Sequence, residues 1–424
     1  SWAKVCWQFG ALLCRNICTD KMKPNSISLE TQATILMTTR LGETGDDLKP
    51  LSPAEFRSVQ RWLCERGLTL GNLLSTDHRA VVDAMIAEGV GTALIPSLLD
   101  RVDSLSRAID HWSAVGIWVI GETDDDYPER LKHRLGSTGF PLLFGAGQRE
   151  FLTTGGVYIV GSRNTSDTGL AFSKTLAARC GAEGITVISS DMRGADREAI
   201  GAASAAGGNI ICVLSDSLEK AVVAKRHREL LEQGKLTVIT PFSPDTRFRV
   251  ANAIRVSRYQ YCLGDFAVIV ETRRTGGVWL GAEENRKENW VPAFVRADDT
   301  VPLGNEALLS LGYMPLAENE VSGCDEIGAY LISRLTTVSA RPPSVTAGPG
   351  DSANEIGALL FNIFCEKLAA FAGKTARSPE EIQDYFRIEP EQAEAWIAQA
   401  LEDGLLEDAD DADQYKARPS NQRH

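Results

Sequence analysis

The feature that most constrains the fold is a repeated unit of apolar strand, glycine-containing turn and helix between residues 156 and 296. Each strand in this region is apolar at almost every position. Such runs indicate strands that are buried on both faces, and their alternation with helices is typical of a parallel sheet covered on both sides. The sequence therefore predicts an α/β fold with a Rossmann-like parallel sheet, whose six strands lie at 157–160, 185–190, 209–216, 236–242, 265–271 and 291–296.

Two shorter apolar runs precede this unit. The runs at 117–120 and 141–147 each predict a strand, and the second one ends in a glycine-containing turn. We therefore expect a single α/β domain over residues 116–320.

A small helical domain is expected before the sheet, over residues 51–115. Ser52, Pro53 and Glu55 form the start signal of a helix, with a capping side chain, a proline in the first turn and an acidic third residue. Apolar residues then follow at helical spacing. We expect a domain of the SAM or helix–hairpin–helix kind, with further helices at 77–88, 93–100 and 102–115.

The carboxyl-terminal part of the chain is expected to form a second domain. Residues 321–352 end in a Pro-, Gly- and Ser-rich stretch and are predicted to be a linker. Helical patterns followed by a short apolar run predict a winged-helix-like domain over 353–410. Residues 411–424 are predicted to be a disordered tail.

The amino-terminal residues 1–50 are predicted to be a disordered or non-native leader. The chain opens with Ser1 rather than methionine, and its first 21 residues hold three of the nine cysteines. Arg15, Lys21 and Lys23 follow the apolar run, which is the reverse of the order in a signal peptide. Translation is expected to start at Met22 or Met37.

The charge distribution, the cysteines and the absence of long apolar runs limit the classes of function that the chain can have. The formal net charge is −13, but residues 353–411 alone contribute −10, so the rest of the chain leaves room for a local basic groove. The nine cysteines form no CxxC pair, which predicts reduced thiols in the cytoplasm and no metal site. The chain has no apolar run of 18 residues, so no membrane partner is expected.

Candidate binding residues lie in the turns that follow the predicted strands, because parallel sheets bind ligands at the carboxyl ends of their strands. The turn Gly161–Arg163 precedes a helix, whose amino-terminal N–H groups suit a phosphate. Arg193 and Gly194 occupy a similar turn. Asp196 in that turn is either part of the site or a cap of the next helix.

Two further turns carry cations. Asp216 and Ser217 precede a basic run at 225–228, which is interpreted as a solvated helix face. Arg273 and Arg274 precede two adjacent glycines, Gly276 and Gly277, and this arrangement predicts an anion cradle. Trp279 is interpreted as a core residue, with stacking on a nucleic-acid base as the alternative.

Taken in order, these motifs resemble the DprA/Smf family over residues 112–315. No single motif is specific, but their order along the chain is. They are GSR at 161–163, S-x-x-x-R-G-x-D at 189–196, V-L-x-D-S-L at 213–218, A-N-A at 251–253, Y-x-Y-x-L-x-D at 259–265 and GGxWxGAxE at 276–284, together with YP at 127–128, PLLFGAG at 141–147, VPAFVR at 291–296 and GNEALLSLG at 304–312.

The resemblance implies a pocket at the strand ends that binds the phosphates of single-stranded DNA, with no cofactor and no catalytic residues. It implies transfer of that DNA to a RecA-type recombinase in DNA uptake and natural transformation, and a homodimer. The predicted DNA- or phosphate-binding residues are Gly161, Ser162, Arg163, Arg193, Gly194, Asp196, Asn252, Arg255, Arg258, Arg273, Arg274, Gly276 and Gly277.

The sequence departs from the family pattern at two places. Residues 190–192 replace a G-x-A segment and bring in the acidic Asp191. The Arg-Asn pair of the family falls on Val256 and Ser257, with Arg255 or Arg258 as substitutes one position away. Each lost phosphate-contacting cation is expected to weaken DNA binding regardless of sequence and to lower its salt dependence.

The second predicted helix of the winged-helix-like domain is acidic. It carries Glu391, Glu394 and Glu402 and no Lys or Arg, so it would repel a phosphate backbone. Contact with protein is therefore favoured for this domain.

The sequence is compatible with two alternative functions. A nucleotide-derived signal sensor on the same scaffold, as in phage defence, is compatible with a pocket of reduced positive charge. A nucleotide-processing hydrolase is a minor alternative, because Glu283 lies near the paired glycines, yet no proline precedes them and Trp279 stands where that group has a threonine. Catalysis is not expected.

Overall fold

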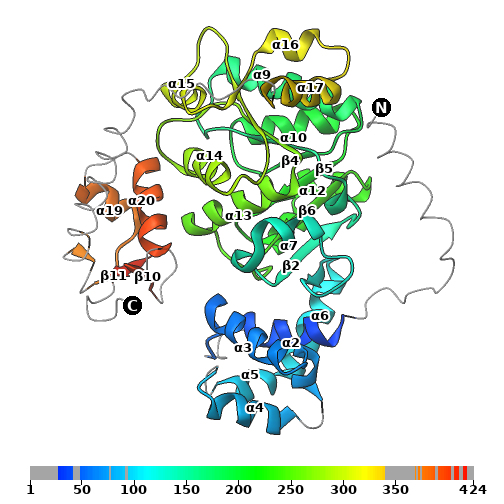
Figure 1. Cartoon of the computed structure of the whole chain (residues 1–424), viewed down its shortest axis with the longest axis vertical. Coiled ribbons are helices and arrows are strands. Elements are labelled where there is room, and N and C mark those ends of the chain that lie inside the picture. Colours follow the sequence, from blue (N-terminus) through cyan, green and yellow to red (C-terminus); the bar gives the residue numbers. More distant parts are fainter. Residues whose placement is uncertain are drawn as a thin grey trace, which may run out of the picture.

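A computed structural model describes residues 27–41, 48–75, 78–90, 94–339, 368, 371–372, 375–386, 390–402, 405–409 and 414–417. Its centre is a nine-stranded sheet (Figure 1). The strands are β1 (Trp118–Gly121), β2 (Leu142–Gly147), β3 (Val157–Val160), β4 (Val187–Ser189), β5 (Ile210–Val213), β6 (Leu236–Thr240), β7 (Phe266–Ile269), β8 (Ala293–Arg296) and β9 (Met314–Leu316).

The strand order is β1-β2-β6-β5-β4-β3-β7-β8-β9. The neighbours from β6 to β9 are parallel, whereas β2 is antiparallel to both β6 and β1. The predicted fold class, with a mostly parallel sheet and a helical amino-terminal region, is confirmed. The sheet is wider than predicted for two reasons. The antiparallel pair β1–β2 joins the parallel strands through pairing of β2 with β6, and β9, which has no apolar run, pairs with β8.

Helices cover both faces of the sheet. Along β3, Val157 and Ile159 face one apolar core, and Tyr158 and Val160 face the other. The first core is closed by α9 (Asp167–Ala182), α10 (Ala195–Ala205) and α11 (Leu218–Val223), with α12 (Lys225–Glu232) following α11. The second is closed by α7 (Glu129–Leu135), α13 (Val250–Leu263), α14 (Gly277–Glu288) and α15 (Leu303–Ser310).

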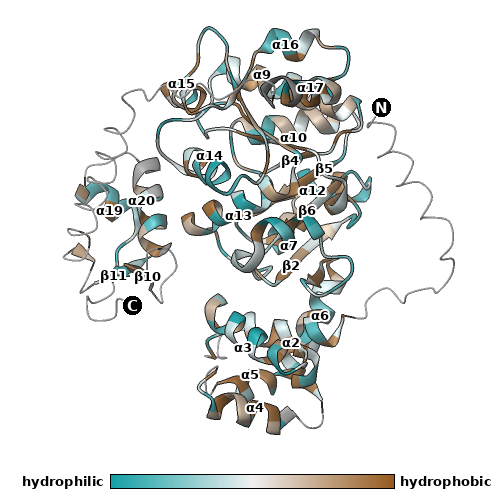
Figure 2. Ribbon diagram, viewed as in Figure 1, coloured by the Kyte–Doolittle hydropathy of each residue, from teal (hydrophilic) through white to brown (hydrophobic). Residues whose placement is uncertain are grey.

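The helical domain below the sheet in Figure 1 contains α2 (Leu29–Thr38), α3 (Pro53–Glu65), α4 (His78–Ala87), α5 (Ile95–Leu99) and α6 (Val102–Ala114). Ser52 caps α3, as predicted, and forms a capping box with Glu55. Helix α5 is hydrophobic along its length (Figure 2), in keeping with its buried Ile95, Leu98 and Leu99.

The prediction of an unstructured leader over 1–50 is wrong for residues 27–41. Helix α2 lies there, and its Ile35, Leu36 and Met37 are fully buried. Thr31 of α2 donates a hydrogen bond to Asp124 Oδ2 in the loop after β1, at 2.8 Å. Threonines at the polar-looking positions of this helix hid its apolar side from a periodicity argument. Residues 1–26 and 42–47 lie outside the described residues.

The prediction of a linker over 321–352 is wrong for its first half. Helices α16 (Glu318–Gly323) and α17 (Ile327–Ser339) both pack against α9. Ile327 and Leu331 are one helical turn apart and fully buried in that contact. The linker interpretation missed this short amphipathic helix, and residues 340–352 lie outside the described part of the chain.

The carboxyl-terminal domain contains α19 (Pro379–Phe386), α20 (Pro390–Glu402), β10 (Leu406–Asp408) and β11 (Tyr415–Ala417). Strands β10 and β11 pair antiparallel, which gives the helix–helix–hairpin order of a winged helix. The prediction of a disordered tail from 411 is wrong at 415–417, because Tyr415 fills the core of this domain beside Ile382 and Leu406. The rest of the predicted tail lies outside the described residues.

Candidate functional site

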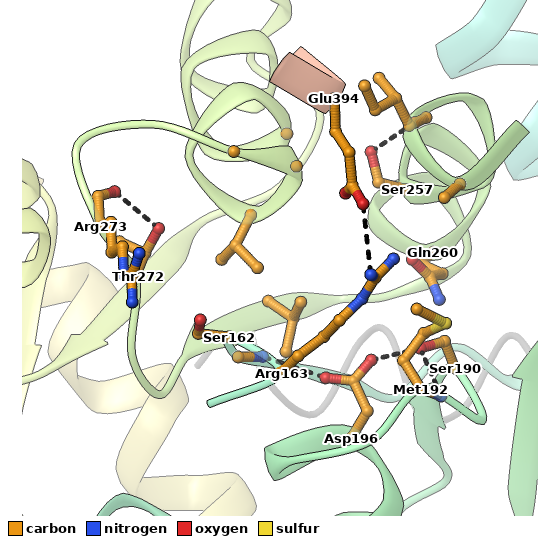
Figure 3. A pocket seen from close by; sticks show the side chains of 18 of the residues that line it. Ser162, Arg163, Ser190, Met192, Asp196, Ser257, Gln260, Thr272, Arg273 and Glu394 are labelled. Atoms are coloured by element: carbon orange, nitrogen blue, oxygen red, sulfur yellow. Dashed lines mark hydrogen bonds and ion pairs between the residues drawn. The ribbon is translucent and has the colours of Figure 1, made fainter. Parts of the chain in front are cut away.

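The sheet topology fixes the position of one crevice. Strands β3 and β7 are neighbours, but the helices that follow them, α9 and α14, pack on opposite faces. At such a switch point the two loops diverge and leave a crevice at the carboxyl ends of the strands. A cavity of about 120 Å³ lies there, lined by the loops after β3, β4 and β7, by one side of α13 and by Glu394 of α20 (Figure 3).

The loop after β3 is held tightly against its neighbours. Gly161 donates its N–H to Asp196 Oδ1 at 3.0 Å, and Ser162 donates its N–H to the carbonyl of Glu271 at 2.9 Å. A Cβ atom on Gly161 would lie 2.7 Å from that of Ala195, so a larger residue would push the two loops apart. The GSR turn is therefore fixed by both adjacent loops.

Arg163 extends from this turn to the rim of the cavity. Its side chain is 42% exposed, and its Nη1 lies 3.3 Å from Glu394 Oε1. The turn leads into α9, which Ser166 caps by accepting the N–H of Gly169. The site thus sets a guanidinium group at the rim of the cavity, and such a group favours an anion.

Asp196 ties the second loop to the first. It accepts hydrogen bonds from the Gly161 N–H and from the Ser190 hydroxyl. The cap position of α10 belongs to Gly194, so the helix-cap alternative for Asp196 is not what the structure has. Burial raises the pKa of Asp196 to about 6, against the hydrogen bonds of Ser190 and Gly161, which lower it.

The stability of the protein should fall as the pH rises from about 4 to 7 because of Asp196. Its carboxyl has a pKa of 3.8 when unperturbed and of about 6 in the fold, so between these values only the folded protein holds the proton. The protonated carboxyl therefore favours folding at low pH. This contribution of about 3 kcal/mol to the free energy of unfolding is lost progressively as the pH rises from about 4 to above about 6. Urea unfolding across this pH range should show a flatter pH dependence for Asp196→Asn than for the wild type.

Asp110→Asn, which changes an exposed carboxylate on α6, is the control and should leave the pH dependence unchanged. If Asp196→Asn and the wild type show the same pH dependence of the free energy of unfolding, the buried-carboxyl argument is contradicted.

The loop after β7 supplies the fourth predicted turn. Gly276 has a φ of +92° and precedes α14, which begins at Gly277 without a side-chain cap from the described residues. Both glycines and Arg273 line the cavity, as predicted. Arg274 is exposed and lies outside the lining.

A buried polar cluster supports this loop from behind. Glu271 accepts hydrogen bonds from the N–H and hydroxyl of Ser166 and from the guanidinium of Arg296. Asn305, also fully buried, accepts the N–H of Thr272 at 2.9 Å. The cluster fixes the start of α9 and the end of β7 together. Sequence reasoning assigned no role to Glu271 or Arg296.

Helix α13 brings a mostly uncharged stripe to the cavity. Its lining residues are Val250, Ala253, Ile254, Ser257, Gln260 and Tyr261. Each of these residues lies three or four positions from another member of the set, as expected for one side of a helix. Three predicted residues fall on other sides of α13 and do not line the cavity: Asn252 is buried, Arg255 is half-buried, and Arg258 Nε lies 2.8 Å from Glu284.

A second, more open cleft of about 600 Å³ shares Arg163 and Met192 with the cavity. Arg193 is exposed on it, so this predicted residue belongs to the neighbouring cleft rather than to the cavity. Asp191, which the sequence presented as an unfavourable acid, is paired with Arg226 and lies 3.5 Å from His227 Nε2. Its charge is therefore compensated within the protein.

The remaining predicted residue, Gly194, forms the contact between the loops after β3 and β4. It has a φ of +102°, and a Cβ atom there would lie 2.4 Å from the carbonyl oxygen of Ser162. Gly194 is therefore a spacing residue and does not line the cavity.

Trp279 and Glu283 lie outside both hollows. Trp279 packs against the core beneath α14, which agrees with the core interpretation. Glu283 lines neither hollow, so the geometry gives no support to a hydrolase that uses this carboxylate. Among the described residues, no three His, Cys, Asp or Glu side chains are grouped to hold a metal ion, and no helix is long and apolar enough to span a bilayer.

Among the described residues that line the cavity, Glu394 is the charged one that sequence reasoning did not assign to the site. Its signal was the acidic character of the second winged-helix helix, which favoured protein contact for that domain. The structure places that helix, α20, against α13 and α14 of the same chain.

Comparison with known proteins identifies the α/β domain. Residues 118–312, just under half of the chain, match the model of the family of DNA recombination-mediator protein A. No curated protein sequence matches the chain.

Solved structures of similar fold include DNA processing protein A (DprA) from Streptococcus pneumoniae. It is 19% identical with a TM-score of 0.51, and the match covers 70% of this chain and 98% of that one. DNA processing protein A from Helicobacter pylori, a structure concerned with single-stranded DNA binding, is 18% identical with a TM-score of 0.43, and the match covers 52% and 96%. A molybdenum cofactor binding protein from Rippkaea orientalis gives 14% identity, a TM-score of 0.31, and 43% and 97% coverage.

The family match covers the strands β1 to β8, the three loops that line the cavity and helix α15 with its buried Asn305. These are the elements in which the ordered motifs lie. Over residues 118–312 the chain therefore matches the family of DNA recombination-mediator protein A (DprA).

Proposed function

We propose that this protein binds single-stranded DNA and that a backbone phosphate is held in the cavity at the switch point. The observation that carries the proposal is the convergence of two glycine turns, the start of α14 and the side chains of Arg163 and Arg273 on one small cavity. Backbone N–H groups at a helix start and arginine side chains are common phosphate ligands. The cavity has room for a phosphate group.

The neighbouring cleft gives the strand a path away from this phosphate. Arg163 lies at the border of the two hollows, and Arg193, Arg197 and Lys220 line the cleft beyond it. A row of cations tracks a nucleic-acid backbone without reading its sequence. Arg163, Arg273 and Arg193 are therefore proposed as phosphate-contacting residues, and Gly161, Gly194 and Asp196 as residues that position them.

Beyond DNA binding, we propose a role in recombination in the cytoplasm, in which the protein passes single-stranded DNA to a RecA-type recombinase during DNA uptake and natural transformation. The support for this step is the family of the α/β domain and the single-stranded DNA binding described for the Helicobacter pylori protein. A homodimer is part of the same proposal.

Arg163→Ala combined with Arg193→Ala should weaken binding of a labelled oligothymidylate strand about 10- to 100-fold at low salt. The reason is the loss of two phosphate-contacting cations, which should also lower the slope of log affinity against log salt by about two units. Fluorescence anisotropy over a salt series measures both effects.

The matched control changes two exposed arginines of the helical domain, Arg61→Ala with Arg107→Ala. It alters the net charge equally and should change the affinity by less than about twofold at moderate salt. Equal loss of affinity in this control and in Arg163→Ala with Arg193→Ala would contradict the proposed phosphate contacts.

A second function is favoured by one observation: the α13 side of the cavity is uncharged, with Val250, Ile254 and Ser257 where the resemblance predicted cations nearby. A small phosphate-containing nucleotide signal would need fewer cations than a DNA strand. Thermal shift against a panel of nucleotides distinguishes the two functions, because a ligand of the folded state stabilises it according to its concentration over its Kd. Stabilisation by one nucleotide, without DNA binding, would favour the sensor.

A further inference from the structure

Helix α20 of the carboxyl-terminal domain is docked on the α/β domain at the mouth of the cavity. Ala398 of α20 is buried in an apolar cluster with Val250 and Ile254 of α13, and Phe248 and Leu280 pack around them. Helix α20 also contacts α14, whose amino-terminal end lines the cavity. Figure 1 shows α20 beside both helices.

This contact is separate from the domain's own core. Within the carboxyl-terminal domain, α20 packs through Ile397 and Ala400 against residues such as Ile382 and Tyr415. Ala398 does not belong to that core. Helix α20 thus has one apolar side for its own domain and a second for α13.

On the docking side, Glu394 lies one helical turn before Ala398. Its carboxylate reaches Arg163 at 3.3 Å and lines the cavity (Figure 3). A carboxylate and a phosphate oxygen are equivalent partners for a guanidinium group. The pair is partly exposed, with 42% of the Arg163 side chain and 27% of the Glu394 side chain accessible.

The two surfaces are complementary in both polarity and charge. On the α/β domain, an apolar stripe of α13 runs beside Arg163, and on α20 an apolar Ala398 lies beside Glu394. The segment 353–411 contributes −10 of the formal net charge of −13 of the chain. A DNA backbone would therefore compete with α20 for the same cation.

We propose that the carboxyl-terminal domain is a built-in competitor of DNA: α20 docks on α13, places the Glu394 carboxylate where a phosphate would contact Arg163, and must leave before a strand binds. This inference rests on the proposed DNA-binding function. The apparent Kd then equals the intrinsic Kd divided by the fraction of molecules in which α20 is undocked.

The decisive variant is Ala398→Glu in the full chain. A carboxylate in the apolar contact with Val250 and Ile254 should expel α20, while the core of its own domain stays intact. The substitution adds negative charge, so any simple electrostatic effect would weaken DNA binding. We expect the affinity for labelled oligothymidylate to rise about tenfold or more instead.

The matched control is Gln399→Glu, which adds the same charge at the next, exposed position of α20. It should leave the affinity unchanged or lower it slightly. A second pair removes one charge: Glu394→Gln should raise the affinity up to about fivefold, as expected for a partly exposed ion pair. Glu380→Gln, at an exposed position of α19, should raise it less.

Docking is measured without DNA by hydrogen exchange of the segment 250–257. Faster exchange in Ala398→Glu than in Gln399→Glu, together with tighter DNA binding, is the expected result. Faster exchange with unchanged or weaker DNA binding would show that α20 docks but does not compete, and unchanged exchange would show that the docking contact does not exist. Either result overturns the inference while the DNA-binding function stands. Failure of every variant, undocked ones included, to bind DNA at low salt would overturn the proposed function itself.

Discussion

Replacing Arg296 by methionine is expected to lower the free energy of unfolding by about 3 to 5 kcal/mol. The guanidinium group is fully buried and pairs with Glu271, and it also donates to the carbonyl oxygens of Val270 and Thr300, each at 3.3 Å. Removing it leaves the carboxylate of Glu271 buried without its cation, and an uncompensated buried charge is far more costly than a lost surface contact.

The effect should reach the site, because Glu271 also accepts the N–H and hydroxyl of Ser166 at the start of α9. Rotation of the Glu271 side chain in the variant would loosen the turn that carries Arg163. Weaker oligothymidylate binding should therefore accompany the loss of stability.

Chemical denaturation of the variant beside Arg228→Met measures the difference. Arg228 pairs with Glu232 on the surface of α12, with both side chains more than half exposed, and its loss should cost less than about 0.5 kcal/mol. Arg296→Lys, which keeps the charge but reaches fewer acceptors, should fall between the two and stays measurable if the methionine variant does not fold. A loss below about 1 kcal/mol in Arg296→Met would contradict the buried-pair argument.

The second large effect is expected for Gly194→Ala, at about 2 to 6 kcal/mol. Gly194 has a φ of +102° and a ψ of −142°, a region open essentially to glycine alone. The new methyl group would also lie 2.4 Å from the carbonyl oxygen of Ser162, which is backbone and cannot rotate away. The loops after β3 and β4 would have to separate, and Arg163 would move with the first of them.

Gly201→Ala in the same helix, α10, is the control with the opposite sign. A Cβ atom there meets no atom within 4 Å, and its φ is not in the left-handed region. Alanine should stabilise that helix by about 0.5 to 1 kcal/mol. Thermal or chemical unfolding of the two variants tests the pair, and equal stability of both would show that neither the backbone conformation nor the close approach matters at 194.

Part of the cavity lining could be predicted from the sequence, because these residues stand in turns next to strands that the local pattern reveals. Gly161, Arg163, Arg273, Gly276 and Gly277 stand directly after apolar runs, and in a parallel sheet these positions gather at one edge whatever the loops contain. These five positions and Ser162, which stands between Gly161 and Arg163, could be named on that basis, and all six line the cavity. The buried cluster behind them was not found, because a lone arginine in a strand such as Arg296 gives no sign of its partner.

Residues of α13 were assigned to the cavity by family motif rather than by helical geometry, and the outcome was mixed. Asn252, Arg255 and Arg258 point to other sides of the helix, whereas Ser257, at a departure from the motif, lines the cavity. A motif gives positions along the chain, but the rotation of the helix decides which of them face the ligand.

The sequence by itself determined the repeated unit of apolar strand, turn and helix. Strands that are apolar at nearly every position must be buried on both faces, and this requirement fixes the class of fold and the edge at which ligands bind. Only the tertiary structure decided which charged side chains pair with one another at that edge. Arg226 compensates Asp191 from 35 residues away, and Glu394 meets Arg163 across 231 residues. Periodicity reflects contacts between neighbours along the chain, whereas the pairing of distant charges depends on how separately formed elements pack, and no local pattern encodes it.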